Sequence, residues 1–260
     1  MDGQPRRHSP RRASILIVDD HEIARSGLRR MLAGAKDLAV IGEAVDGREA
    51  LELARRLCPN MVLMDVRMPD LDGITATRML KQDLSTTSVI MVTMYQNADY
   101  LYQALKAGAA GYLLKDASKR QVLATVRQVL WGGALLHPEL TVPLLRRLAA
   151  ETTLPAEPPL EQLTPREREV LCLVVQGKPN HEIAAQLRVS PHTVKARVEQ
   201  IIAKLGVSDR TQAAVRAVEF GYAGHCLGVS PSPGPASHLA DAGLAGWTMS
   251  GGSACGYGER

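Results

Sequence analysis

The sequence predicts an α/β fold, a doubly wound parallel five-stranded domain, followed by a second, smaller all-α domain. Two observations carry this prediction. Five short apolar runs alternate with helical patterns in the first half of the chain, and residues 163–220 show helical patterns throughout. A length of 260 residues leaves room for two domains. We therefore expect an α/β domain at residues 14–133 and a helical domain at 163–220, joined by a linker at 134–162. A disordered basic N-terminus should cover residues 1–13 and a disordered tail residues 221–260.

The strands of the first domain are predicted where apolar residues run without interruption. Such runs are typical of strands that are buried on both faces. Because helical patterns separate them, the sheet should be parallel with right-handed crossovers. The five runs are Ile15–Val18, Leu38–Ile41, Met61–Met64, Val89–Val92 and Tyr112–Leu114.

Helices are predicted between these strands and again after the linker. The last helix of the first domain should cover Ser118–Trp131, because two glycines follow it. A short helix is possible at Val142–Ala150, inside a linker that prolines interrupt. In the second domain, Thr164–Pro165 and Ser190–Pro191 each combine a capping residue with a proline in the first turn, and a third helix should start after Ser208–Asp209.

Composition and charge exclude several classes of protein. The net charge of +4 permits nucleic-acid binding without arguing for it. No stretch is long and apolar enough to cross a membrane, and no signal peptide is recognisable, so we expect a cytoplasmic protein with no membrane contact. Cys58 and Cys172 lie in apolar helical patterns and are expected to be reduced, buried thiols.

Three carboxylates follow predicted strands. Asp19 and Asp20 come after the first strand and Asp65 after the third. If those strands are neighbours, the three side chains meet at the carboxyl edge of the sheet, where ligands of open parallel sheets bind. Like charges at this spacing repel unless a cation joins them, and Mg²⁺ prefers such oxygen ligands.

Two further polar residues end the remaining strands. Thr93 follows the fourth strand and Lys115 the fifth. A carboxylate nucleophile, a metal, a cation and a hydroxyl donor are the groups that phosphoryl transfer requires. Taken singly, each has an ordinary structural explanation: Asp20 as a helix cap and Lys115 as a solvated surface group. The full set at the correct strand ends favours the chemical interpretation.

The first domain resembles the receiver domain of response regulators, which has a flavodoxin-like fold. The matching segments are Ile15–His21, Asp65–Gly73 and Gly108–Asp116. The resemblance implies that Asp65 is the phospho-acceptor for a sensor histidine kinase. It also implies that Asp19, Asp20, Asp65 and the backbone carbonyl of Arg67 bind Mg²⁺, that Lys115 contacts the phosphoryl group, and that Thr93 and Tyr112 form a switch pair.

An enzymatic alternative uses the same chemistry. Hydrolases of the haloacid dehalogenase type also place an aspartate nucleophile and Mg²⁺ at a strand end. Their motif needs a second aspartate two residues later as general acid, and this chain has Arg67 there. The sequence therefore argues against a turnover enzyme.

The helix after Ser190 has one apolar face. Val194, Val198, Ile201 and Leu205 recur at helical spacing and should pack inward. The remaining faces could enter a major groove or contact phosphates, although an ordinary solvated helix face is the simpler interpretation of this helix alone. The candidate DNA-binding residues are His192, Thr193, Lys195, Ala196, Arg197, Glu199 and Lys204.

The segments Leu163–Leu171, Asn180–Ala184, Val189–Lys195 and Ile202–Val207 resemble a LuxR-type helix-turn-helix domain. With the receiver this defines the NarL/FixJ type, and it implies a phosphorylation-gated transcription factor that binds double-stranded promoter DNA, contacts RNA polymerase and forms a homodimer through Gln212–Glu219. Two departures from the family pattern are Pro179, where Asn180 is expected to cap the helix instead, and Glu199. They keep open a second hypothesis, a phospho-accepting interaction protein that binds DNA weakly.

Overall fold

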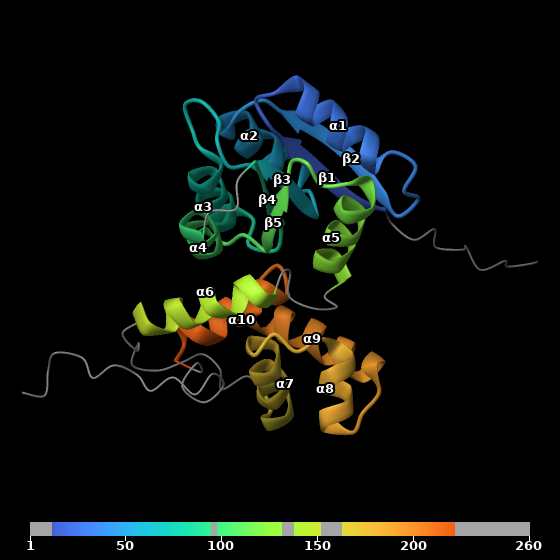
Figure 1. The fold of residues 1–260 in the computed structure, drawn as a ribbon, viewed down its shortest axis with the longest axis vertical. Helices are drawn as coiled ribbons and strands as arrows, with labels where there is room; N and C mark the ends of the chain where they lie inside the picture. The colour runs from blue at the N-terminus through green and yellow to red at the C-terminus, as the bar shows by residue number, and fades with distance from the viewer. Residues whose placement is uncertain (1–11, 95–97, 132–137, 152–162, 222–260) are drawn as a thin grey trace, which may run out of the picture.

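The first domain is an open parallel sheet with helices on both faces. The computed structural model describes residues 12–94, 98–131, 138–151 and 163–221. The strand order is β2-β1-β3-β4-β5, and every pair is parallel (Figure 1). The strands are β1 Ala13–Val18, β2 Leu38–Ala44, β3 Met61–Asp65, β4 Ser88–Thr93 and β5 Gly111–Leu114. All five predicted strands are therefore confirmed, and β1 begins one residue before the expected domain boundary.

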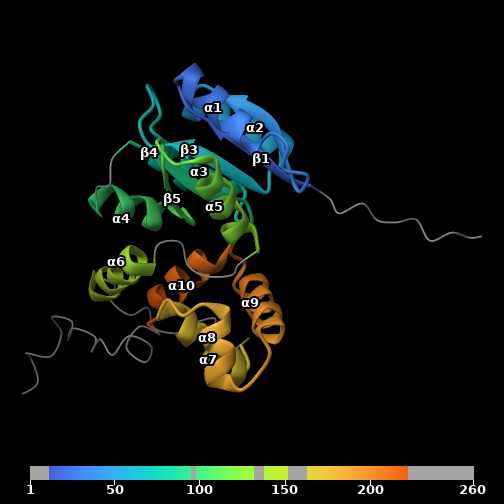
Figure 2. The same cartoon turned by 45° about the vertical axis from the view of Figure 1, so that its right-hand side comes forward.

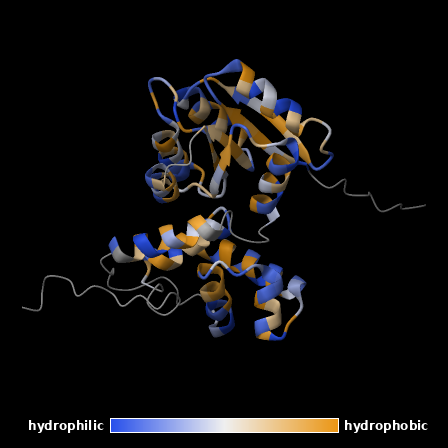
Figure 3. Ribbon diagram, in the orientation of Figure 1, coloured by the Kyte–Doolittle hydropathy of each residue, from blue (hydrophilic) through white to orange (hydrophobic). Residues whose placement is uncertain are grey.

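Alternating side chains of the strands fill two separate cores. Ile15 and Ile17 of β1 face one core, and Leu16 and Val18 face the other. All four are buried because helices cover both faces of the sheet (Figures 1 and 3). One face carries α1 (Glu22–Leu32) and α5 (Lys119–Trp131). The other carries α2 Gly47–Leu57, α3 Gly73–Asp83 and α4 Ala98–Ala107.

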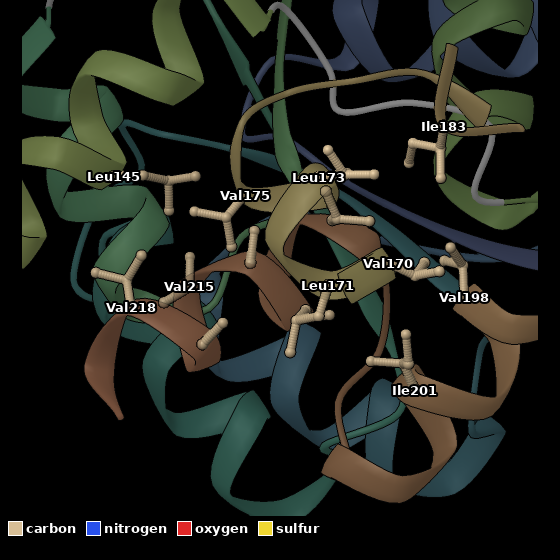
Figure 4. Close-up of a cluster of buried hydrophobic side chains, with 14 of the residues drawn as sticks. Leu145, Val170, Leu171, Leu173, Val175, Ile183, Val198, Ile201, Val215 and Val218 are labelled. Atoms are coloured by element: carbon tan, nitrogen blue, oxygen red, sulfur yellow. The ribbon is translucent and has the colours of Figure 1, made fainter. Parts of the chain in front are cut away.

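The second domain is helical, as predicted, and its helix starts follow the predicted caps. Its helices are α7 Pro165–Val175, α8 Asn180–Leu187, α9 Pro191–Leu205 and α10 Arg210–Glu219. Thr164 forms a capping box with Glu167, and the Ser190 and Asp209 side chains cap α9 and α10. Figure 4 shows the aliphatic core, in which Val170 and Leu171 of α7 meet Val198 and Ile201 of α9 and Val215 of α10.

Helix α6 (Pro138–Glu151) lies within the segment expected to be a linker. It begins four residues before the expected short helix and continues through Pro143, which removes one backbone hydrogen bond. Leu145 and Leu148 are buried in the core of the helical domain, and this burial offsets the cost of the proline. Part of the expected linker is therefore a packed helix.

The two domains meet where α6 and α10 face α4 of the sheet domain (Figures 1 and 2). Tyr102 and Leu105 of α4 join the core of the helical domain. Gln212 Nε2 of α10 donates a hydrogen bond to the Ala109 carbonyl over 2.6 Å. Arg147 of α6 forms an ion pair of 2.9 Å with Asp99 at the start of α4. The described structure is thus a closed arrangement, in which α10 packs against the first domain.

The cysteines differ from the expectation of two buried thiols. Cys58 is free, but it is exposed and ends α2 in the left-handed conformation. Cys172 of α7 takes part in a disulfide, so the expectation of a reduced thiol is wrong for this residue. Among the described residues, no helix has the length and apolar character needed to span a bilayer.

Candidate functional site: a strand-end acidic centre and a nucleic-acid helix

The predicted carboxylates converge at one edge of the sheet. Strand β1 lies between β2 and β3, so the chain reverses its direction of winding there, and Asp19, Asp20 and Asp65 follow the carboxyl ends of β1 and β3. Ligands bind at such switch points because two neighbouring loops diverge and leave a crevice. Asp20 does not cap α1: the N-cap is His21, and its backbone N–H donates to Asp19 Oδ1 over 2.9 Å.

Lys115 lies between the two buried carboxylates. Its Nζ atom is 2.8 Å from Asp65 Oδ2 and 2.8 Å from Asp19 Oδ2. Asp19 is 0% exposed and Asp65 4% exposed. A single ammonium group therefore offsets the repulsion of two carboxylates in a site with little water.

The surroundings shift the pKa values of this group of side chains. Burial raises the pKa of Asp65, and the charge of Asp19 raises it further, against the opposing effect of the Lys115 hydrogen bond. Burial alone would lower the pKa of Lys115, but the attraction of the Asp19 and Asp65 carboxylates together outweighs burial and raises this pKa. Lys115 is thus held as a cation beside a carboxylate whose negative charge lacks full compensation.

The residues fit a divalent cation. Ligand atoms of Asp19, Asp20, His21 and Asp65 all lie within 4.8 Å of one another. Asp19 Oδ2 is buried, and within the described part of the chain it accepts no hydrogen bond of good geometry, even though the Lys115 ammonium is close. Carboxylate oxygens with spare lone pairs are the ligands that Mg²⁺ selects.

The loop after β3 is held against Asp65 by a glycine that sequence reasoning did not single out. A Cβ atom on Gly73 would lie 1.8 Å from the Asp65 carbonyl oxygen. The backbone N–H of Gly73 donates to the Val66 carbonyl over 3.1 Å, and Asp72 caps α3. Its place next to the capping Asp72 is the signal that could have identified this close approach.

The remaining predicted receiver residues lie around the same edge. Thr93 ends β4 and is buried; Tyr112 lies on β5 and is buried among α4 side chains. Both line a small apolar cavity next to α4. The backbone N–H of Arg67 contributes a hydrogen bond to Asp65, whereas its side chain donates to the Tyr100 hydroxyl over 3.1 Å.

Helix α9 carries the candidate nucleic-acid residues. Val194, Val198 and Ile201 are buried as predicted, and Leu205 is partly buried against the same core. His192 and Glu199 are exposed, and Thr193, Lys195, Ala196 and Arg197 are half-buried. The Thr193 hydroxyl is already engaged with Ser190, and the Lys195 ammonium lies 3.8 Å from the Glu199 carboxylate.

Two residues have structural roles that the sequence did not predict. Lys204 forms an ion pair of 2.7 Å with the capping-box residue Glu167, so its ammonium links α9 to α7. Asn180 does not replace the missing cap at Pro179, since α8 has no side-chain cap. Instead, the Asn180 side-chain oxygen accepts a hydrogen bond from the buried guanidinium of Arg210. The expected capping role of Asn180 is therefore wrong.

Comparison with known proteins assigns both halves of the chain. Residues 15–127 match the response regulator receiver domain, and residues 161–217 match the bacterial regulatory proteins of the luxR family. The transcriptional regulatory protein LiaR of Bacillus subtilis is 41% identical over 205 residues, which are 78% of this chain and 95% of LiaR. The response regulator protein VraR of Staphylococcus aureus is 38% identical over 205 residues, 79% of this chain and 96% of VraR.

Solved structures are also similar. The receiver domain of the putative response regulator NarL from Mycobacterium tuberculosis is 35% identical and covers 45% of this chain, with a TM-score of 0.44. The response regulator ChrA of a heme-sensing two-component system is 32% identical and covers 79%, with a TM-score of 0.41. Both domain types are matched, and one relative is 41% identical over almost its whole length. The chain therefore belongs to the two-component response regulators that join a receiver domain to a LuxR-type DNA-binding domain and regulate transcription.

Proposed function

We propose that Asp65 accepts a phosphoryl group from a sensor histidine kinase and that this reaction controls promoter binding through α9. The observation that carries the proposal is the placement of Lys115 between the buried carboxylates of Asp19 and Asp65. One carboxylate oxygen of Asp65 attacks phosphorus, and the bond between phosphorus and the kinase imidazole nitrogen breaks, so that its electron pair stays on the imidazole. Lys115 then contacts a phosphoryl oxygen as a point charge.

Mg²⁺ fits the same site, with Asp19, Asp20, Asp65 and the Arg67 carbonyl as its protein ligands. When bound, it would neutralise charge on the incoming phosphoryl group. Steady turnover is not expected, because Arg67 occupies the place of a general acid, and its guanidinium is directed to Tyr100. The protein is thus a phosphoryl acceptor with at most slow autodephosphorylation, acting in the cytoplasm.

The route from Asp65 to the DNA-binding domain runs through α4. The cavity beside Thr93 and Tyr112 is also lined by Leu101 and Leu105 of α4 and by residues of the helical domain, Thr141 and Leu144 of α6 and Thr211 of α10. A change in the positions of the Thr93–Tyr112 switch pair therefore alters the packing that holds α6 and α10 against α4. Release of α10 would make Gln212–Glu219 available for a homodimer on paired half-sites, where the protein contacts RNA polymerase.

DNA binding by the full chain tests this proposal. We would measure the affinity for genomic promoter fragments with and without acetyl phosphate and Mg²⁺, for the wild type and for Asp65→Ala. We expect the phosphodonor to strengthen binding in the wild type only. Affinity that responds equally in both proteins, or in neither, would contradict phosphorylation-gated binding.

A second function, a phospho-accepting interaction protein with weak DNA binding, is favoured by α9 itself. Glu199 is exposed on the helix, and Lys204 is occupied by Glu167. Specific retardation of genomic fragments in a gel-shift experiment would exclude this function.

A further inference from the structure

We propose that the cleft between the two domains binds a small molecule that carries two or more phosphate groups, and that this ligand stabilises the closed arrangement. The cleft has a volume of about 340 Å³ and shares none of its lining residues with the cavity beside the switch pair. One wall comes from α3 and α4, and the other from the α9–α10 turn and α10. Its polar lining includes Arg78, Lys81, Lys106, Ser208, Gln212 and Arg216.

Positive charge exceeds negative charge in the lining of this cleft. Arg78, Lys81, Lys106 and Arg216 line it, and Glu219 is the carboxylate among its lining residues. Arg216 pairs with Glu219 at 3.4 Å, and Lys106 has a loose contact of 3.6 Å with Glu151. Within the described ranges, no carboxylate forms an ion pair with Arg78 or Lys81. Two cations therefore face the cleft without a direct counter-charge.

Lys81 is fixed in position by neutral oxygens from both domains. Its ammonium donates to the Thr87 carbonyl over 2.6 Å and to the Ser208 hydroxyl over 2.5 Å. Its stem passes over Gly108, where a Cβ atom would lie 2.6 Å from Lys81 Cγ. The nearby Asp209 carboxylate is occupied by Ser208 and by the backbone N–H of Gln212. Burial lowers the pKa of Lys81, and the charge of the nearby Asp209 only partly opposes this effect.

Phosphate is the anion that this set of donors suits. Arginine offers a planar fork for two phosphate oxygens and lysine a point charge. The Gln212 side-chain amide, which uses one N–H on the Ala109 carbonyl, lies within the same lining with a second N–H to donate. The volume is in the range of small-molecule sites and exceeds what one phosphate ion fills. A ligand held by Arg78 and Arg216 contacts both domains, so it binds the closed arrangement better and opposes DNA binding by linkage.

Calorimetry on the full chain tests the site without DNA or phosphorylation. We would titrate pyrophosphate, ADP and inorganic phosphate into the protein in Mg²⁺-free buffer. We expect saturable binding of pyrophosphate or ADP, weaker binding of inorganic phosphate, and a loss of about tenfold or more in Arg78→Gln, since one charge-assisted contact is removed. Tighter binding of ADP than of pyrophosphate would identify a nucleotide as the natural ligand, and the reverse would identify an inorganic polyphosphate.

Two control variants distinguish the cleft from general anion attraction. Arg120→Gln and Lys119→Gln each remove an exposed positive charge from the start of α5. Both should bind pyrophosphate as the wild type does. Absence of saturable binding, or an equal loss in either control, would overturn the site.

The effect on the closed arrangement has its own measurement. Pyrophosphate should weaken promoter binding by the wild type and leave Arg78→Gln unaffected. If pyrophosphate binds in calorimetry but leaves DNA affinity unchanged, the ligand does not stabilise the closed arrangement, and that half of the proposal is wrong. Failure of phosphorylation to change DNA binding would contradict the proposed function but not the ligand site, because the calorimetric test uses neither phosphorylation nor DNA.

Discussion

At the level of single residues, the acidic centre depends on Lys115. Two carboxylates that are almost completely buried share its ammonium group, each at 2.8 Å. Removal of one partner from a buried ion pair is costly because the remaining charge keeps its desolvation penalty. The same removal leaves more carboxylate charge for a metal ion to neutralise, so stability and metal binding are coupled at this site.

Lys115→Met should lower the free energy of unfolding by about 3 kcal/mol in EDTA. Added Mg²⁺ should then recover more stability than it adds to the wild type, because the variant has no competing ammonium group. Denaturation in urea with and without Mg²⁺ measures both effects. Lys119→Met, on the exposed start of α5, is the control. An equal Mg²⁺ effect in the wild type and Lys115→Met would count against metal binding by these carboxylates.

Glu199→Ser should tighten DNA binding by roughly three- to tenfold at low salt. The exposed Glu199 carboxylate is repelled by phosphates, and its removal frees Lys195, which lies 3.8 Å away. Fluorescence anisotropy with promoter fragments at two salt concentrations measures the change. Gln200→Ser, a neutral substitution at the neighbouring exposed position, is the control. Unchanged affinity for every fragment would show that Glu199 does not face the DNA.

Residues at strand ends were predictable in a way that residues on helix surfaces were not. Once strands are assigned, the flavodoxin-like fold that the resemblance implies brings the carboxyl ends of β1 and β3 together, so Asp19 and Asp65 could be placed from sequence. The partner of Lys204 depends on how α9 crosses α7, which no local pattern specifies. Likewise, Asn180 matches a cap by residue type, but Arg210, thirty positions later, takes its side-chain oxygen.

At the level of elements, the start of α3 sets the geometry around Asp65. Gly73→Ala should destabilise the receiver domain by about 3 kcal/mol and impair phosphorylation, because its Cβ would overlap the Asp65 carbonyl oxygen. Gly27→Ala is the matched control: it lies within α1, has nothing within 4 Å, and should stabilise the helix by about 0.5–1 kcal/mol. Similar thermal shifts in the two variants would contradict the close approach.

The capping box of α7 predicts a pH-dependent stability. Burial raises the pKa of Glu167, but hydrogen bonds from Lys204 and Thr164 outweigh it, so this pKa lies below its ordinary value of 4.5. A carboxyl group whose pKa is lower in the folded protein stabilises the fold at a pH above its pKa in the unfolded chain. This stabilisation is lost as the pH falls through the pKa of the folded state. Glu167→Gln should therefore cost about 1–2 kcal/mol at pH 7 and less below pH 4.5. Urea denaturation at several pH values measures this, and the exposed Glu169→Gln is the control. A difference in the free energy of unfolding between the wild type and Glu167→Gln that does not change with pH would contradict the prediction.

Helix α6 shows why element boundaries in the linker could not be predicted. Its local signals are contradictory: Pro143 argues for a helix start near Val142, while the structure begins the helix at Pro138. The burial of Leu145 and Leu148 against α10 decides the outcome, and α10 begins only at Arg210, far along the chain from α6. Capped helices such as α7 and α9 were predictable because their start signals are contained within four residues.

At the level of the whole molecule, the closed arrangement joins the two functions of the chain. The receiver covers α10 and contacts α6, while the exposed residues of α9 remain outward. Phosphorylation is therefore expected to act on the packing of α6 and α10 before it affects DNA contacts. The contact between α4 and α6 is polar at its rim and apolar at its centre, around Tyr102 and Leu145.

Arg147→Ala should open this contact and give DNA binding without a phosphodonor. The Arg147 guanidinium pairs with Asp99 at 2.9 Å, pairs with Glu151 at 3.2 Å and lies 4.2 Å over the Tyr102 ring. Arg147 also orients Glu151, which accepts a hydrogen bond from the Tyr102 hydroxyl. Burial and this hydrogen bond together raise the pKa of Tyr102 to about 12.

We expect Arg147→Ala without acetyl phosphate to bind promoter fragments several-fold more tightly than the unphosphorylated wild type, with a larger radius of gyration in small-angle scattering. Arg146→Ala, the exposed neighbour on the same helix, controls for the loss of positive charge. If Arg147→Ala opens the molecule in scattering but leaves DNA affinity unchanged, closure does not restrain α9 or α10. In that case phosphorylation must act on DNA binding by another path, such as contacts between the receivers of two chains.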